Sequence, residues 1–439
     1  MAARADVDSH LGRRGAAIDA ALSEWCVPDL SDADRVNVVQ SYLVQADLGD
    51  AGRVGGGTSV MAERCRAAPA APTVLIVGTH DIGQLAKTES NPARPFDPTE
   101  LRGPGLGSTF APTVAFAEGF KATLTADQGD SVNIRILSIG PGESLTAALS
   151  AINTDDIDAV FFTNSVAWGP NHPTITIGAR GRLEVQITIT AGQLVNDATF
   201  AGAVRNPLNK LVELLGGLRD PQGKVAIPGF YRRANPPGGS DRAELTKDGF
   251  DPNEWIGGLD VRRPAGSVSA LERATMWPAV SISDIDAPDT TGTSTPASAT
   301  ATLSIYLVPD QRPVEVEAAL KSWVKQQVPA NLAATVSVLS IARPYRSSPD
   351  QLAVAAQSRA ASRIHGRAPL FVPGGGAIGA GEVQFATGAS VGFAGICGPR
   401  NGFGSADEVV PRALFDLGIS QAAETCLQLR RRTALRSTS

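Results

Sequence analysis

Imidazole and thiol groups are scarce in this chain of 439 residues, which has four histidines and four cysteines. The cysteines form no C-x-x-C pair, so the spacing of a zinc ribbon is absent. This supply is too small for a local metal site with three or more His or Cys ligands. Carboxylates are more plentiful, and Asp81 and Glu143 each follow a short run typical of a buried strand. Acid–base chemistry based on carboxylates is therefore the first expectation.

Polar side chains follow each of the first three predicted strands of the chain. In an open α/β sheet, ligands bind at the carboxyl ends of the strands. We therefore predict one cleft at that edge, with solvated turn and capping residues as the alternative interpretation. The candidate residues at the strand ends are Thr79, His80, Asp81, Glu143 and Asn164.

A glycine-rich loop at residues 103–109 precedes a predicted helix and offers backbone N–H groups to an anion. The hydroxyl groups of Ser108 and Thr109 add polar contacts. The loop lacks the Lys-Ser/Thr ending of a P-loop and does not match G-x-G-x-x-G, so a nucleotide site is not predicted. A flexible turn is the alternative. Arg180 and Arg400 are further candidates for binding an anion.

Histidine could serve as an acid–base group in such a cleft. His80 and His172 are the two candidates, and His172 lies between Asn171 and Pro173. Ordinary packing or loop histidines are the favoured alternative for both.

Short apolar strands alternate with helices in the first part of the chain. This pattern predicts βαβ units and a mostly parallel sheet flanked by helices. Two helices are expected within the first seventy residues, and Ser31 is the expected N-cap of the second. Further along, strands are expected at 73–78, 131–137 and 157–163, with helices at 111–127 and 144–153.

The pattern changes near residue 180, where residues 182–190 alternate apolar and polar side chains like a half-exposed antiparallel strand. The expected elements after it are a helix at 206–218, a surface loop at 283–301, a strand at 302–308, a helix at 314–327 and a strand at 334–341. These elements predict a smaller inserted α+β domain at 184–345. The α/β domain would then be discontinuous, at 1–183 and 346–439. Its last part would hold a helix at 351–365, a strand at 391–396 and a helix at 409–432.

Charge and hydropathy limit the compartment and the partners. Lys plus Arg is 39 and Asp plus Glu is 44, a net charge of −5 that argues against a general nucleic-acid binder. The first residues contain no apolar stretch of a signal peptide, and no apolar run is long enough to cross a bilayer. We therefore expect a cytoplasmic protein without membrane or nucleic-acid partners.

Several segments resemble the zinc-dependent superfamily of aminoacylases, dipeptidases, carboxypeptidase G and succinyl-diaminopimelate desuccinylases. The resemblance covers about residues 15–430. Its most specific part is AVRNPLNKLVELLGGLRDPQGKVAIPGFY, and other parts are VLIVGTHD, RGPGLGST and NGFGSADE. It implies a two-zinc catalytic domain with an inserted lid or dimerisation domain, in agreement with the expected pattern of elements.

The metal ligands of that superfamily do not carry over to this sequence. Asp81 matches the second position of the H-x-D motif and Glu143 matches one metal ligand. The other ligand and catalytic positions of the superfamily fall on Thr79, Ser108, Gly142, Asn164, Asn196, Tyr306 and Gly404. We therefore predict no zinc, no cofactor and no metallopeptidase activity. A hard cation on Asp81, Glu143 and Asn164 is an alternative.

The resemblance implies a cleft for a small amino-acid-derived substrate, free or linked to a carrier protein. We predict a repurposed enzyme in which Asp81, Glu143 and His80 are the catalytic candidates and the reaction is non-hydrolytic, such as C–N ring closure with loss of an anion. The substrate-binding candidates are Thr79, Ser108, Thr109, Asn164, Asn196, His172, Arg180, Tyr306 and Arg400. The chain also resembles the aziridine-forming proteins of azinomycin-type antibiotic biosynthesis, which work with a smaller partner subunit.

Two other functions remain open. The chain could be a non-catalytic subunit that binds a partner enzyme or a carrier protein. It could also be a true metallopeptidase with unrecognised ligands. In either case a homodimer through the lid domain is a possible assembly.

Overall fold

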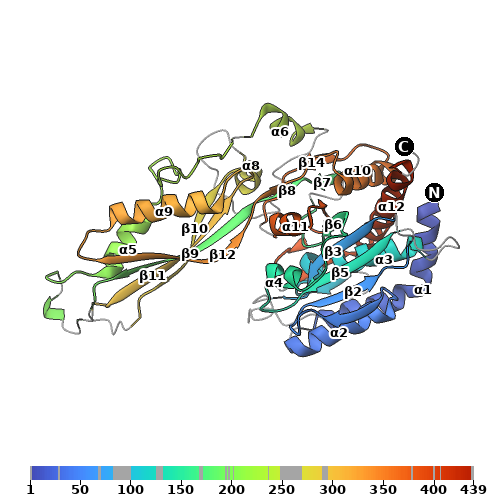
Figure 1. The fold of residues 1–439 in the computed structure, drawn as a ribbon, viewed down its shortest axis with the longest axis horizontal. Coiled ribbons are helices and arrows are strands. Elements are labelled where there is room, and N and C mark those ends of the chain that lie inside the picture. Colours follow the sequence, from blue (N-terminus) through green and yellow to red (C-terminus); the bar gives the residue numbers. More distant parts are fainter. Residues whose placement is uncertain are drawn as a thin grey trace.

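A computed structural model describes the chain at residues 2–27, 30–67, 71–82, 100–124, 132–167, 172–192, 195, 198–200, 202–235, 237–247, 269–288, 295–376, 379–398, 401–405 and 407–436. The described part forms two lobes, an α/β lobe that holds both ends of the described chain and an elongated lobe built on an antiparallel sheet (Figure 1). No helix in these ranges is long and apolar enough to cross a membrane.

The α/β lobe is built on a six-stranded sheet with strand order β1-β2-β5-β3-β6-β15. Strands β5, β3, β6 and β15 are parallel, whereas β2 is antiparallel to β5 and β1 is antiparallel to β2. The bounds are β1 Asp50–Arg53, β2 Val60–Arg64, β3 Thr73–Thr79, β5 Asn133–Ile139, β6 Ala159–Phe162 and β15 Ser390–Phe393. The parallel strands are buried on both faces, which explains their continuous apolar runs.

Helices cover the two faces of this sheet. Val74 and Ile76 of β3 face the layer that contains α3, while Leu75 and Val77 face α4 and α11. Helix α3 is buried on all sides because α1 and α12 pack on its outer surface. The helices of the lobe are α1 Ala2–Trp25, α2 Asp32–Gln45, α3 Ala111–Leu124, α4 Leu145–Ser150, α10 Leu352–His365, α11 Ala380–Thr387 and α12 Arg412–Arg436.

The second lobe is an antiparallel sheet with strand order β10-β11-β9-β12 (Figure 1). Alternate residues of β9 are fully buried against α5 and α9, as the period of two in the sequence predicts. The bounds are β9 Gly181–Thr190, β10 Ala279–Asp286, β11 Ser298–Leu307, β12 Ala333–Ala342, α5 Pro207–Gly216, α6 Gly239–Glu244, α8 Ala270–Thr275 and α9 Pro313–Gln327.

Short elements join the two lobes and line the loops around the main sheet. Strand β8 pairs with β13, β14 pairs in parallel with β7, and β16 pairs with β4. The bounds are β4 Glu100–Gly103, β7 Thr174–Thr176, β8 Gly178–Ala179, β13 Tyr345–Arg346, β14 Leu370–Val372, β16 Glu408–Pro411, a π-helical turn η2 Leu106–Phe110 and a 3-10 turn η3 Ala198–Phe200.

The predicted fold class is confirmed: a mixed α/β sheet carries an inserted domain with an antiparallel sheet. Ser31 is the N-cap of α2, as expected. Three details differ. The edge strand β1 and its neighbour β2 form where no strand was predicted, because both are too short for a clear apolar pattern in the sequence. The predicted loop at 283–301 contains the end of β10 and the start of β11, and α12 begins after β16 rather than at residue 409.

Candidate functional site

The turn after β3 carries the first predicted site residues at the carboxyl edge of the sheet. Thr79 Oγ1 donates to the carbonyl of Ile139 at 2.8 Å and accepts the N–H of Asp81 at 3.0 Å. The first bond ties the turn to the end of the neighbouring strand β5, and the second lies within the turn itself. Thr79 therefore fixes the shape of the turn, and Asp81 is the first residue after the turn.

His80 lies beneath this turn with no exposed surface. Its Nδ1 is 2.8 Å from Ser138 Oγ, and its Nε2 is 3.0 Å from the carbonyl oxygen of Thr58, to which it donates. Burial lowers the pKa of His80 to about 4, although the bond to Thr58 favours the charged ring. Proton exchange with a bound substrate would thus require the chain at Thr58 to move.

Glu143 holds the same segment from the other side. Its carboxylate accepts the N–H of Thr58 at 2.6 Å and the N–H of Ser59 at 3.1 Å. The Ser59 side chain first, and then these two backbone N–H groups, keep the pKa of Glu143 below its usual range. His80 and Glu143, both predicted as catalytic groups, therefore meet at the turn between β1 and β2, and both have structural partners there.

Thr58 and Ser59 are not among the residues predicted from the sequence. No motif marks this turn, and the two strands that the turn connects were not predicted.

The glycine-rich loop is already occupied by a carboxylate of the protein. Glu408 Oε2 accepts the N–H groups of Gly107 at 2.6 Å and Ser108 at 2.7 Å, and Oε1 accepts Gly404 N–H at 2.7 Å. The expectation that these loop amides hold a substrate anion is therefore wrong for Gly107 and Ser108. Burial raises the pKa of Glu408 despite these donors. In the sequence, Glu408 is only the last residue of the segment NGFGSADE, and nothing there marks it as the partner of this loop.

The two hydroxyl groups of the loop differ. Thr109 Oγ1 donates to the carbonyl of Gly105 within the loop itself. Ser108 Oγ is buried and makes no hydrogen bond of standard geometry within the described residues, but its side chain lies close enough to the Glu408 carboxylate to oppose the rise of that group's pKa. The side chain of Ile82, one residue after Asp81, lies where a Cβ on Gly105 would stand. The Ser108 hydroxyl is thus a buried polar group beside Glu408, in the loop that packs beside the Asp81 turn.

Arg180 and Tyr306 lie together where the two lobes join. The guanidinium carbon of Arg180 is 4.5 Å from the centre of the Tyr306 ring, and its Nε donates to the carbonyl of Gly375 at 2.8 Å. Burial lowers the pKa of Arg180 to about 10. Within the described ranges no carboxylate pairs with Arg180, and its two terminal nitrogens have no hydrogen-bond partner. A half-buried guanidinium without a counter-ion has the chemistry to bind an anion.

The remaining predicted residues do not join these groups through any described contact. Asn164 is half-buried after β6, and its side chain makes no hydrogen bond within the described part of the chain. His172 is half-buried at the start of the segment that leads into β7. Asn196 and Arg400 lie outside the described residues.

The described donor set does not fit the zinc pair that the resemblance implies. Glu143 is committed to two backbone N–H groups, and the ring of His80 points to Thr58 and Ser138. Among the residues that the structure describes, no three His, Cys, Asp or Glu side chains gather in a group that could hold a metal ion. We therefore derive no chemical step through a metal.

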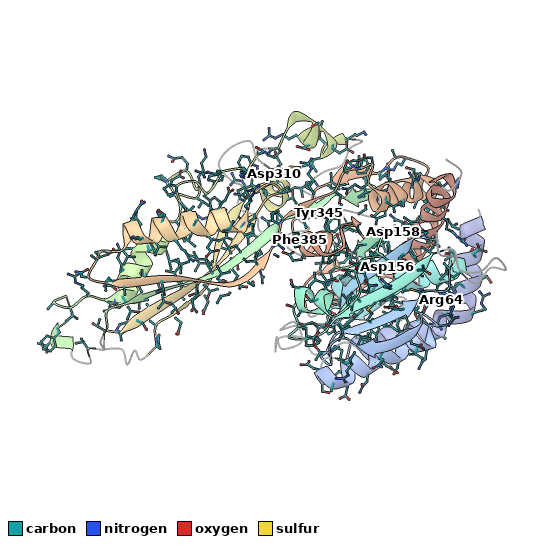
Figure 2. The ribbon with its side chains drawn as sticks, viewed as in Figure 1. Arg64, Asp156, Asp158, Asp310, Tyr345 and Phe385 are labelled. Carbon is teal, nitrogen blue, oxygen red and sulfur yellow. The ribbon has the colours of Figure 1, made fainter. Side chains whose placement is uncertain are left out.

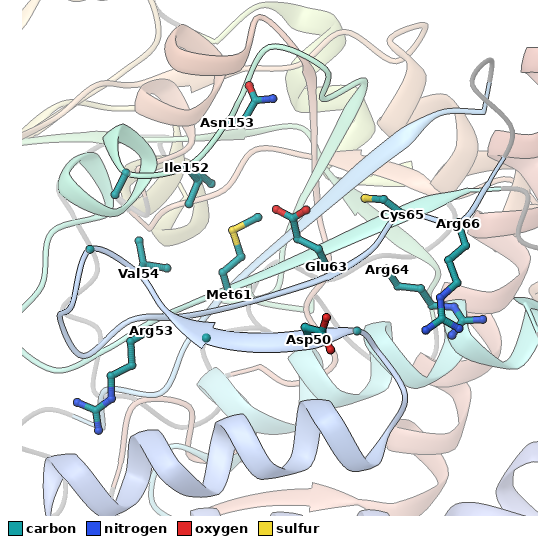
Figure 3. Close-up of a pocket in the computed structure, with 14 residues that line it drawn as sticks. Asp50, Arg53, Val54, Met61, Glu63, Arg64, Cys65, Arg66, Ile152 and Asn153 are labelled. Atoms are coloured by element: carbon teal, nitrogen blue, oxygen red, sulfur yellow. The ribbon is translucent and has the colours of Figure 1, made fainter.

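A groove of about 690 Å³ lies along the edge strand β1 and its neighbour β2, away from the predicted residues. Residues 151–153, which directly follow α4, also line it. Met61 and Glu63 point toward Ile152 and Asn153 across it (Figure 3). It contains none of the candidate residues, and its charged groups have both signs.

Comparisons with known proteins agree with the fold. A profile of the peptidase dimerisation domain of the M20 family matches residues 177–331. Rat Beta-Ala-His dipeptidase is 26% identical over 266 residues, which are 57% of this chain and 54% of that protein. The human enzyme of the same name is 24% identical over 330 residues, 71% of this chain and 65% of that protein. The matched region thus spans between half and two thirds of these relatives.

Solved structures match over nearly the whole chain. The di-peptidase Dug1p of Saccharomyces cerevisiae has a TM-score of 0.78 at 19% identity and covers 98% of both chains. An M20 family metallo-carboxypeptidase of Sulfolobus solfataricus has a TM-score of 0.79 at 20% identity, covering 94% of this chain and 98% of its own. With its mixed α/β sheet and an inserted dimerisation domain, this chain has the fold of the M20 peptidases.

Proposed function

We propose that this protein is a metal-independent, non-hydrolytic member of the M20 fold that acts on a small amino-acid-derived carboxylate. One observation carries the proposal: Arg180 is half-buried, stacked on Tyr306, and has no counter-ion in the described chain. A guanidinium has the planar geometry to hold a carboxylate with two hydrogen bonds. A substrate carboxylate would supply the missing charge.

Asp81 and Ser108 support a reaction at the neighbouring edge of the sheet. In the ring closure that we favour, an amine nitrogen attacks a carbon of the same substrate, and a C–N bond forms. The leaving group departs from that carbon as an anion with the bonding electron pair, and Asp81 takes the proton from the nitrogen. The buried Ser108 hydroxyl, which has no hydrogen bond of standard geometry in the described residues, would donate to the departing anion.

The experiment measures binding before turnover. N-acetylglycine, a simple carboxylate probe, is titrated against the full chain and against Arg180→Met, with Arg13→Met on the exposed face of α1 as the control. We expect binding to weaken at least tenfold in Arg180→Met and to be unchanged in the control. Equal binding by all three proteins would refute the assignment of Arg180.

A metal-dependent dipeptidase is the second candidate function, and the printed names of the relatives favour it. Purified protein should be analysed for zinc and tested for cleavage of β-Ala-His and Cys-Gly with and without a chelator. Our proposal expects no stoichiometric zinc and no chelator-sensitive cleavage. About two zinc ions per chain with such cleavage would establish the dipeptidase and overturn the proposal.

The inserted domain also supports a homodimer. Its edge strand β12 runs for ten residues, AATVSVLSIA, without one charge or proline. Edge strands that stay monomeric are generally protected by charges, prolines or a covering segment. We propose that β12 contacts a second copy, and that Ser337→Lys, which places a charge on its outer face, shifts the species seen by light scattering from dimer to monomer. A monomeric parent protein would contradict this.

A further inference from the structure

A second cavity lies at the junction of the two lobes, beside the Arg180 site, and neither Arg180 nor Tyr306 lines it. Its volume is about 360 Å³. One side is formed by β8, β14 and Gly374, and the other by α6, α8 and the residues that follow β11 up to Asp310. Asp310 lies where the inserted lobe meets the α/β lobe (Figure 2). The cavity is therefore shared by both lobes.

The walls are largely apolar. A Cβ on Gly374 would lie 2.2 Å from the carbonyl oxygen of Gly178, so backbone closes this wall and no other residue fits there. The volume suits a compound with several non-hydrogen atoms rather than a single ion. The apolar side chains of the walls are Ile177, Met276, Val308, Pro309, Phe371 and Pro373.

The charged groups on the cavity are unbalanced toward negative charge. Three carboxylates, Asp241, Glu244 and Asp310, face one guanidinium, Arg346, which leaves a net charge of −2. Asp241 is neutralised, because its Oδ1 is 2.9 Å from Arg346 and its Oδ2 accepts a backbone N–H. The excess charge thus belongs to Glu244 and Asp310.

Among the described residues, Asp310 forms no ion pair, and Glu244 has one long ion pair, with the exposed Lys247. Glu244 Oε1 accepts the N–H of Phe371 at 3.1 Å, and its Oε2 is 3.8 Å from Lys247 Nζ. Asp310 Oδ2 accepts the side-chain amide of Asn235 at 3.3 Å. Both carboxylates keep acceptor sites for a further donor.

We infer that this cavity binds a small organic cation, a primary ammonium group on a short apolar chain. The ammonium would be held by Asp310 and Glu244, and the chain would lie on the apolar walls. The three N–H donors of the ammonium group would bind the two carboxylates, which have acceptor sites left. The methylene groups of the alkyl chain would pack on apolar wall residues such as Met276 and Phe371. A neutral or anionic compound of the same size would lack the first of these interactions.

The inference is tested with the full chain and ligand-observed saturation-transfer NMR at constant ionic strength. The probes are n-butylammonium, n-butanol and butyrate. The variants are Asp310→Asn and Glu244→Gln, with Asp284→Asn on the exposed face of β10 as the matched control. Asparagine keeps the size of Asp310 and tolerates its left-handed backbone (φ +75°), so this variant should fold.

We expect n-butylammonium to bind at least tenfold more tightly than n-butanol, and butyrate not to bind in this cavity. Asp310→Asn and Glu244→Gln should each weaken n-butylammonium binding at least fivefold, and Asp284→Asn should not change it. Equal affinity for n-butanol, or full binding by Asp310→Asn, would overturn the inference. N-acetylglycine binding by Asp310→Asn should stay normal, so the failure of this site and the failure of the Arg180 site are separate results. If Glu244→Gln does not fold, Asp310→Asn decides alone.

Discussion

Replacing Glu118 with glutamine tests how strongly one buried carboxylate holds the helical layer together. Glu118 on α3 has no exposed surface and joins three elements. It lies 2.6 Å from His10 Nε2, and it accepts Arg14 Nη2 and the Tyr42 hydroxyl, both at 2.8 Å. Burial alone would raise the pKa of Glu118, but the bonds from His10 and Arg14 outweigh it and hold the pKa below its usual value. The ionised form is therefore the one that the fold stabilises.

The expected cost follows from the burial of this network. Removing one partner of a buried ion pair costs about 3–5 kcal/mol, because the remaining charge is left uncompensated. The matched control is Glu317→Gln on α9, where Glu317 forms an i,i+4 pair with Lys321 at 2.6 Å on the exposed face. Such exposed pairs contribute about 0.3–0.5 kcal/mol. The two substitutions make the same chemical change and should differ about tenfold in effect.

Hydrogen exchange of backbone amides is the suitable assay, because a chain with two lobes does not guarantee a single unfolding transition. The free energy of opening is compared for peptides from α1 and α3 in the parent protein and both variants. Glu118→Gln should lower it by about 3–5 kcal/mol, or to the detection limit, while Glu317→Gln leaves it unchanged. If both variants protect α1 and α3 equally, the ionic network does not stabilise this layer.

Two further predictions concern packing and pH. Gly119→Ala should destabilise the α/β lobe by about 1–3 kcal/mol, because its Cβ would lie 2.4 Å from the Ile419 carbonyl oxygen where α3 crosses α12. Gly12→Ala on α1, where nothing lies within 4 Å of the new Cβ, should be neutral or stabilising by about 0.5–1 kcal/mol. Thermal unfolding of the two variants measures the contrast, and similar melting temperatures would contradict it. His80 has a pKa of about 4 in the fold against 6.5 unperturbed, so it binds its proton more readily when the chain is unfolded. The stability of the fold should therefore fall as the pH drops from about 6.5 toward 4. The imidazole NMR signal that is lost in His80→Gln should titrate near pH 4, and a signal that titrates near 6.5 would show that the ring is not enclosed.

Much of the candidate site could be found from sequence because strand ends are visible in it. Thr79, His80 and Asp81 directly follow a continuous apolar run, so their place at the sheet edge was predictable. The direction in which each side chain points was not. His80 turns down to Thr58, because a turn can place consecutive side chains on opposite sides, and nothing local distinguishes a buried ring from a catalytic one.

The sequence alone determined the α/β class, the inserted antiparallel lobe and the residue types available at the cleft, because hydrophobic periodicity and composition are local properties. Only the tertiary structure decided which charged side chains are paired within the fold and which remain available to a ligand. Glu408 and Gly107 are separated by three hundred residues, and their pairing removes the loop amides from the predicted anion site. Arg180, in contrast, receives no carboxylate partner from any described segment. A group's function depends on what surrounds it, and long-range packing determines those surroundings.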